Sequence, residues 1–286
     1  MPADLIHNPG LKPYAPPAKI VAEMIHVFNI VLIEFVFGTV TALICNHIGI
    51  DQKTGLGAGS IIGSILALII WFRFFSPEYK WKPESGSWGK SLRLLIPLCI
   101  YWVFLFSTFG YLSKGFPFGL ISISSLLAAI MAGAGEEVAF REVGISYLAR
   151  QWKDENKIIL MAIIPAAAFA LTHVTNIVTL SLPDVLKQAL LTFFLGVFLG
   201  AVYIRTGNIW TIILGHSLHD IMAFSAGDKL SMLGMNLPDW SVAFITVTES
   251  GLFISALYML RKSKRAEIIA LWDKRWSRDT GVTEEV

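Results

Sequence analysis

The sequence is poor in charged residues and in cysteine. Of its 286 residues only 15% are Asp, Glu, Lys or Arg, and the two cysteines, Cys45 and Cys99, lie inside apolar runs. A soluble domain carries about 25% charged residues, so the deficit argues against one. Isolated cysteines in apolar runs are expected to pack as small hydrophobic side chains and not to form a disulfide framework or a metal site. With 55% hydrophobic residues and a mean hydropathy of +0.62, the composition indicates a chain embedded in a lipid bilayer.

Two other kinds of feature are missing. The formal net charge is only +2, and no basic patch is interleaved with aromatic residues, so nucleic acid is not an expected partner. The segment 1–22 lacks a charged region that leads into a short apolar core with a small-residue cleavage site. We therefore expect no cleavable signal peptide there.

Long apolar runs dominate what is present. A helix needs about 20 mostly apolar residues to cross a bilayer, and eight segments approach that length. They are about 23–46, 57–75, 92–112, 119–141 (continuing as helix toward 152), 158–181, 184–204, 209–226 and 240–260. Proline, glycine and charged residues separate them. The sequence thus predicts an all-α, polytopic membrane protein with about eight transmembrane helices.

The distribution of basic residues predicts the orientation. If the eight spans alternate, 18 of the 23 Lys and Arg residues fall on the side of the termini, 4 fall on the other side, and Arg141 lies within a span. The positive-inside rule then places both termini in the cytoplasm of a multi-pass cell-membrane protein. We expect a cytoplasmic segment over 1–22, a transmembrane bundle over 23–260, and a basic cytoplasmic tail over 261–286. That tail is predicted to be solvated or to lie on the anionic inner leaflet.

Ionisable residues inside the spans are candidate functional residues, because burying them in a membrane is costly. The set comprises Glu34, Glu136, Glu137, Arg141, Glu142, His173, His216, His219, Asp220 and Glu249. Glu142 is expected to face the lipid interface. Glu249 has no evident partner in the sequence and is expected to be a packing or gating residue, while Glu34 has no assigned role.

Helical spacing groups several of these residues. Arg141 follows Glu137 by four residues, so the two side chains can meet on one helix face. The segments before and after the turn near 154 should run antiparallel, which places Glu136 and His173 at one level, about 27 Å from that turn. His216 lies about 13 Å from the next turn at that end. The spacing therefore predicts one cavity, open to the cytoplasm, that contains all three side chains. Small residues over 132–135 should let neighbouring helices approach closely.

Three motifs carry a family resemblance. Residues 136–141 (EEVAFR) fit EExxxR, residues 169–173 (FALTH) fit FxxxH, and residues 216–220 (HSLHD) fit HxxxN/D. In this order, on nearby spans, they resemble the intramembrane glutamate proteases that include the CAAX prenyl endopeptidases of the Ras-converting type and the bacteriocin-processing proteins. The resemblance covers about residues 120–225 and does not reach the first three spans.

The resemblance implies a catalytic group of four residues. Glu136 would act as general base on a water molecule, and His173 would position and polarise that water. His216 would donate to the oxyanion, with Asp220 orienting it or contacting the intermediate. Asp220 stands where the prenyl-protein branch has Asn, and an ionised Asp is a poorer donor, so the resemblance leaves its role open.

The resemblance also implies supporting residues and a substrate class. Glu137 and Arg141 would form a structural ion pair that sets the electrostatics, and Phe140 and Phe169 would wall the substrate cavity. Neither a cofactor nor a metal is implied. The substrate would be a peptide, either a prenylated protein C-terminus or a leader peptide, cut near the membrane surface.

Other functions fit parts of this pattern. Glu136, His173, His216 and Asp220 could bind zinc, although the sequence contains no HExxH. A non-catalytic scaffold or bacteriocin-immunity protein could keep the same cavity and bind a partner without cutting it. A transporter could use intramembrane acids as a proton relay, but no inverted pair of broken helices is visible.

Overall fold

The fold is described from a computed structural model. Its described residues are 32–33, 36–75, 79–80, 82–84, 86–116, 118–119, 121–152, 154–178, 180–232 and 238–276. The expected segment 1–22, Glu34, most of the first half of the first predicted span and the end of the chain after 276 lie outside these residues.

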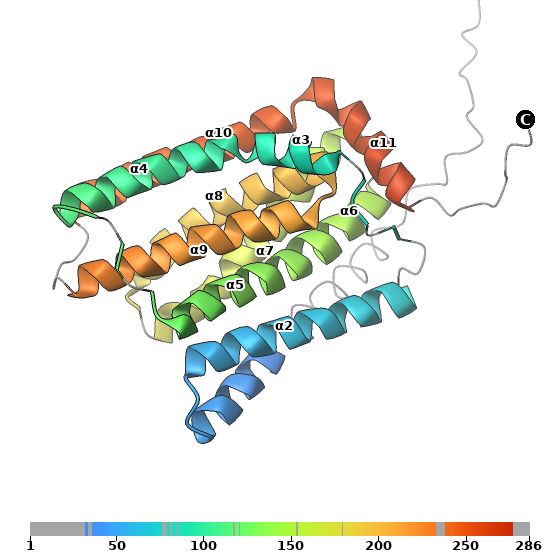
Figure 1. The fold of residues 1–286 in the computed structure, drawn as a ribbon. Helices are drawn as coiled ribbons and strands as arrows, with labels where there is room; N and C mark the ends of the chain where they lie inside the picture. Colours follow the sequence, from blue (N-terminus) through green and yellow to red (C-terminus); the bar gives the residue numbers. More distant parts are fainter. Residues whose placement is uncertain are drawn as a thin grey trace, which may run out of the picture.

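The described part of the chain is helical and contains no strand, and the long helices run roughly side by side (Figure 1). An apolar helix over Val36–His47 precedes α2. The labelled helices are α2 (Gln52–Ile70), α3 (Ser87–Leu94), α4 (Ile96–Leu112), α5 (Ile123–Glu137), α6 (Ser146–Gln151), α7 (Ile158–Thr172), α8 (Leu182–Thr206), α9 (Ile209–Met232), α10 (Asp239–Met259) and α11 (Arg265–Trp276). The all-α fold class is confirmed.

Short irregular helical segments join several of these helices. The π-helical segments η1 (Trp71–Phe75) and η2 (Val138–Ile145) extend α2 and connect α5 to α6, respectively. Three 3₁₀ turns are η3 (Glu155–Lys157), η4 (His173–Val178) and η5 (Lys262–Lys264). Because α5, η2 and α6 are continuous, the helix predicted past 141 toward 152 is present.

Four of the described helices are long and apolar enough to cross a membrane. They are Ser87–Leu112, Glu155–Val178, Leu182–Thr206 and Asp239–Met259. The chain is a membrane protein. The total of eight spans and the orientation of the termini stay predictions.

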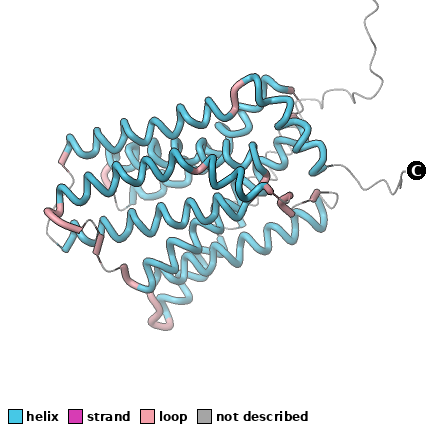
Figure 2. Tube along the Cα trace, turned by 45° about the horizontal axis from the view of Figure 1, so that its top comes forward, coloured by secondary structure: helices cyan, strands magenta, loops and turns pink. Residues whose placement is uncertain are grey.

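Helix α8 lies at the centre of the core and packs against α7 and α10, whereas α5 packs between α2 and α9 (Figure 1). Figure 2 shows, in a view turned by 45°, that short loops join several of the described helices. Every residue of α8 from Leu195 to Thr206 is buried. Small residues make these contacts close. A Cβ added at Gly196 would lie 3.1 Å from Ala166 of α7, and one at Gly133 of α5 would lie 2.7 Å from the Ser217 hydroxyl of α9. The close approach predicted over 132–135 is therefore present at Gly133.

The C-terminal helix α11 packs on the bundle. Its Ile268, Trp272 and Arg275 are buried, and the indole N–H of Trp272 donates to the Ile204 carbonyl at 3.0 Å. The indole N–H of Trp276 likewise donates to the Ser146 carbonyl at 3.0 Å. The prediction of a solvated tail is wrong for residues 265–276, because one face of α11 is buried against the other helices of the bundle.

Helices α3, α6, α8 and α11 meet at one end of the bundle (Figure 1). We call this the basic end, since most of the described basic residues gather there. They include Lys80, Lys90, Arg93, Arg150, Lys157, Arg205 and those of residues 261–275. It is the end that the positive-inside rule assigns to the cytoplasm.

Candidate active site

The three motif segments meet in space. Helix α5 packs against α9, and the π-helical segment η2 packs against α7. The EExxxR motif spans the junction of α5 and η2, FxxxH lies at the end of α7, and HxxxD lies on α9. π-Helical turns often occur at functional sites, and here one begins directly after Glu137.

Glu137 lies at the centre of the site. Its Oε1 atom is 3.0 Å from Nη1 of Arg141 and 2.7 Å from Nδ1 of His216. The side chains of Glu137 and Arg141 are fully buried, and that of His216 is 5% exposed. A buried carboxylate shared in this way fixes both partners, because neither has water as an alternative. The ion pair predicted between Glu137 and Arg141 is present.

Arg141 is held on its other sides by α8 and by an aromatic ring. Its Nη2 atom donates to the Gly196 carbonyl at 3.2 Å. Its guanidinium lies 5.0 Å from the centre of the Phe169 ring, within cation–π range. The Phe140 and Phe169 rings lie 5.2 Å apart, and both are buried. The two predicted wall residues therefore lie together and pack on the ion pair.

The second ring nitrogen of His216 faces two more carboxylates. Its Nε2 atom lies 3.6 Å from Oε2 of Glu136 and 3.7 Å from Oδ1 of Asp220. The side chains of these two acids are 26% and 21% exposed, in contrast to the buried Glu137. Two adjacent glutamates thus occupy different environments, and Glu136 and Asp220 form the accessible edge of the site. That this edge faces the cytoplasm stays a prediction.

His173 occupies the first position after α7. Its Nδ1 atom lies 3.2 Å from the Phe169 carbonyl and 3.4 Å from the Thr172 hydroxyl. The Phe169 ring lies 5.1 Å from the His173 ring and 5.8 Å from the His216 ring. Both histidines therefore contact one phenylalanine, which brings His173 close to His216. The common level of His173 and Glu136 stays a prediction.

Glu249 has a partner that the sequence did not suggest. The Tyr101 hydroxyl on α4 donates to its Oε2 atom at 3.1 Å, and the Tyr101 ring stacks on His219 at 5.9 Å. The signal was available, because a buried tyrosine in an apolar helix needs an acceptor for its hydroxyl. The expectation that Glu249 lacks a partner is wrong.

Glu142 is buried and does not face the lipid interface as expected. Its side chain accepts a hydrogen bond from the Tyr203 hydroxyl at 2.5 Å and lies 3.7 Å from Nη2 of Arg275. Local spacing gave no sign of this contact, because Arg275 lies on α11, more than a hundred residues further along the chain.

Among the residues described, no group of three or more His, Cys, Asp or Glu side chains is arranged to hold a metal ion. A catalytic zinc site needs three such ligands. The arrangement instead gives one buried carboxylate that orients an imidazole and one accessible carboxylate on the far side of that imidazole.

The fold and the site define a helical membrane protein with glutamate and histidine side chains gathered inside it. Residues 118–222, which contain all three motifs, match the family model described as type II CAAX prenyl endopeptidase Rce1-like. The match supports the family resemblance that the three motifs carry. No curated protein and no solved structure matches the chain.

Proposed function

We propose that this protein is an intramembrane endopeptidase of the CAAX type, in which Glu136 activates a water molecule for attack on a peptide bond. The observation that carries the proposal is the unequal placement of the paired glutamates. Glu137 is buried between Arg141 and His216, whereas Glu136 is accessible and lies 3.6 Å from the same imidazole. The family match to a prenyl endopeptidase supports the reaction class.

The chemistry follows from these positions. Glu136 removes a proton from water, and the resulting hydroxide attacks the scissile carbonyl carbon. His173 helps to position that water. The oxyanion accepts a hydrogen bond from Nε2–H of His216, which faces the accessible edge. This donor requires the imidazolium form of His216, because Nδ1–H is donated to the Glu137 carboxylate. When the C–N bond breaks, the amine leaving group takes the proton back from Glu136.

Glu137 is the residue that we propose orients His216, and the distances from the His216 ring nitrogens support this role. Its 2.7 Å contact with Nδ1 is of hydrogen-bond length, whereas the 3.7 Å between Asp220 and Nε2 is not. Asp220 is then the residue that contacts the substrate or the tetrahedral intermediate. Phe140 and Phe169 shape the wall beside the ion pair.

The substrate class follows from the family and from the membrane setting. We expect a peptide bond near the membrane surface, in a prenylated CaaX protein C-terminus or in a leader peptide. A prenyl group or an apolar leader would hold the substrate in the bilayer beside the site.

The test is cleavage of a farnesylated CaaX peptide, and of a leader peptide, by the purified full-length protein. We expect Glu136→Gln to lower the cleavage rate at least about 100-fold, because the amide cannot take a proton from water. Glu84→Gln is the matched control, since Glu84 is exposed and pairs with Lys274 away from the site. Unchanged cleavage by Glu136→Gln would rule out the mechanism. Cleavage that stops with a chelator and returns with zinc would favour the metal alternative.

A further inference from the structure

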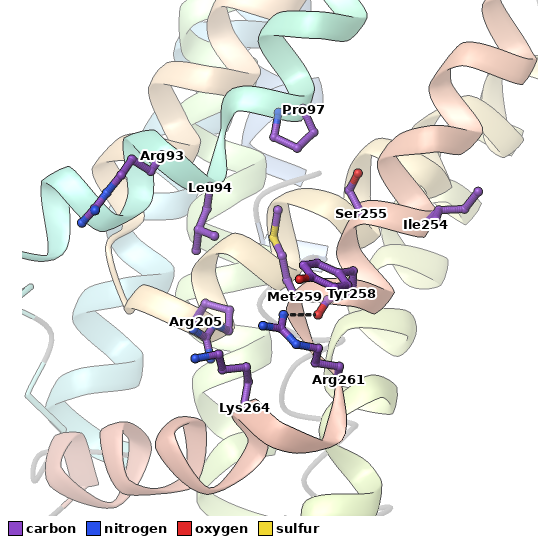
Figure 3. A pocket seen from close by; sticks show the side chains of 10 residues that line it. All are labelled: Arg93, Leu94, Pro97, Arg205, Ile254, Ser255, Tyr258, Met259, Arg261 and Lys264. Atoms are coloured by element: carbon purple, nitrogen blue, oxygen red, sulfur yellow. Dashed lines mark hydrogen bonds between the residues drawn. The ribbon is translucent and has the colours of Figure 1, made fainter.

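A cavity of about 620 Å³ opens at the basic end, away from the motif residues. Its walls come from α3, α4, α8, α10 and the turn that leads to α11. None of its lining residues belongs to the candidate active site. Figure 3 shows Arg205, Arg261 and Lys264 grouped on one side of Leu94 and Met259. This cavity is called the basic pocket below.

Positive charge dominates the basic pocket. Four of the residues that line it are basic, Arg93, Arg205, Arg261 and Lys264, and none of the described lining residues is acidic. Glu267 of α11 supplies a carboxylate to two of these side chains, 3.3 Å from Arg205 and 3.8 Å from Lys264.

One carboxylate cannot balance this charge. Lys90 also bonds to Glu267, at 2.6 Å, and that hydrogen bond holds the pKa of Glu267 below its usual range. Glu267 is therefore ionised at neutral pH and contributes one negative charge among five basic side chains. The pocket keeps a net positive charge and suits an anionic ligand.

The residues that line the basic pocket change from apolar to basic toward the C-terminal end of α10. On α10 the lining residues are first Ile254 and Ser255, then Tyr258 and Met259, and after the helix ends Arg261 and Lys264 follow. Seven residues separate Ile254 from Arg261, a rise of about 10 Å. Because α10 is one of the membrane-spanning candidates, this change follows the passage from hydrocarbon to headgroups.

One of the basic groups is already held in place. The Arg261 guanidinium lies 4.1 Å from the centre of the Tyr258 ring, and its Nη1 atom donates to the Tyr258 carbonyl at 2.8 Å (Figure 3). Guanidinium groups recognise phosphate oxygens through paired N–H donors. A group fixed in this way loses less conformational freedom when a phosphate binds.

We propose that the basic pocket binds the headgroup of an anionic phospholipid, with its acyl chains along α4 and α10. The phosphate accepts hydrogen bonds from the basic side chains, and the chains lie against Pro97, Ile254 and Met259. A zwitterionic lipid would bring an ammonium group into the same positive field. The site should therefore prefer phosphatidylglycerol over phosphatidylcholine.

The test is native mass spectrometry of the delipidated full-length protein in detergent, titrated with each of the two lipids. We expect one phosphatidylglycerol to bind per chain and phosphatidylcholine to bind more weakly. The double substitution Arg93→Gln and Arg261→Gln should weaken phosphatidylglycerol binding on the order of 30-fold, because each basic group contributes about fivefold near an anionic headgroup. Both side chains are at least partly exposed, so the variant should fold.

The matched control removes two other charges from the same end. Lys80→Gln with Lys274→Gln changes exposed residues outside the pocket and should leave lipid binding unchanged. An equal loss of phosphatidylglycerol binding in this control would show that general surface charge holds the lipid, and it would overturn the proposed site. Equal binding of the two lipids would also overturn it. Competition by glycerol phosphate at the same concentration as the lipid would assign the pocket to free phosphate esters.

Discussion

At the scale of single residues, the site depends on two neighbouring glutamates with different surroundings. Consecutive residues on a helix project about 100° apart, so one side chain can be buried while the next reaches an accessible edge. Glu137 is buried with Arg141 and His216, and Glu136 is 26% exposed. Burial therefore gives Glu137 a structural task and leaves Glu136 for the proposed chemistry.

This difference predicts unequal effects of the two substitutions on stability. Glu137→Gln should lower the free energy of unfolding by about 3 kcal/mol or more, because it leaves the buried Arg141 guanidinium without its counter-charge. Glu136→Gln should change it by less than about 1 kcal/mol, since the side chain is partly exposed. Thermal unfolding of both variants in one detergent measures the contrast. Equal unfolding temperatures would contradict the assignment.

At the scale of helices, the site is held by the close contact of α5 with α9. Gly133 lies three residues before Glu136, and His216 and Ser217 are adjacent on α9. The contact between Gly133 and Ser217 therefore sets the distance between the helices that carry the glutamates and the imidazole. The π-helical segment η2 then places Phe140 and Arg141 against α7 and α8.

Adding one methyl group at this contact should disturb both stability and activity. In Gly133→Ala the new Cβ would lie 2.7 Å from the Ser217 hydroxyl and 2.9 Å from its backbone nitrogen, so α5 and α9 must move apart. We expect a loss of about 1–3 kcal/mol in stability and a lower cleavage rate.

A second glycine offers the matched control for this prediction. Gly251 on α10 has nothing within 4 Å of an added Cβ, so Gly251→Ala should be neutral or slightly stabilising. Thermal unfolding and the cleavage assay compare the two variants. If Gly133→Ala behaves like Gly251→Ala, close packing does not position the site.

At the scale of the whole molecule, Arg275 of α11 links this helix to the π-helical segment η2, which contains Glu142. This guanidinium lies 3.7 Å from Glu142, donates to the Tyr79 hydroxyl at 3.0 Å and donates to the Gly207 carbonyl at 2.5 Å. The Tyr203 hydroxyl adds a second contact to Glu142. One buried group therefore connects α11 to η2, to α8 and to the turn before α9.

Removal of this guanidinium should loosen the basic end. Arg275→Ala leaves the buried Glu142 without a cation, so we expect about 3 kcal/mol less stability and faster proteolysis within α11. Lys274→Ala is the control, because that side chain is 71% exposed. Glu142→Gln combined with Arg275→Ala should recover part of the loss. Identical unfolding of Arg275→Ala and Lys274→Ala would contradict the role of Arg275.

Most of the candidate site was predictable because its motifs are local. A spacing of four residues places Glu137 and Arg141 on one helix face, and counting residues from a turn places Glu136 and His173 at one depth. The pairs that were missed are long-range. Glu142 meets Arg275, and Tyr101 meets Glu249, only after separate helices pack.

The amino-acid pattern alone was sufficient for the membrane setting, the helical class and the family resemblance, because hydropathy and short motifs are read along the chain. Helix packing settled which carboxylate is buried and which is accessible. Packing also decided that residues 265–276, expected to be a tail, form the helix α11, which Trp272 and Arg275 hold against the bundle. The physical reason is that a buried charge depends on its partners for stability, and here those partners come from distant segments of the chain.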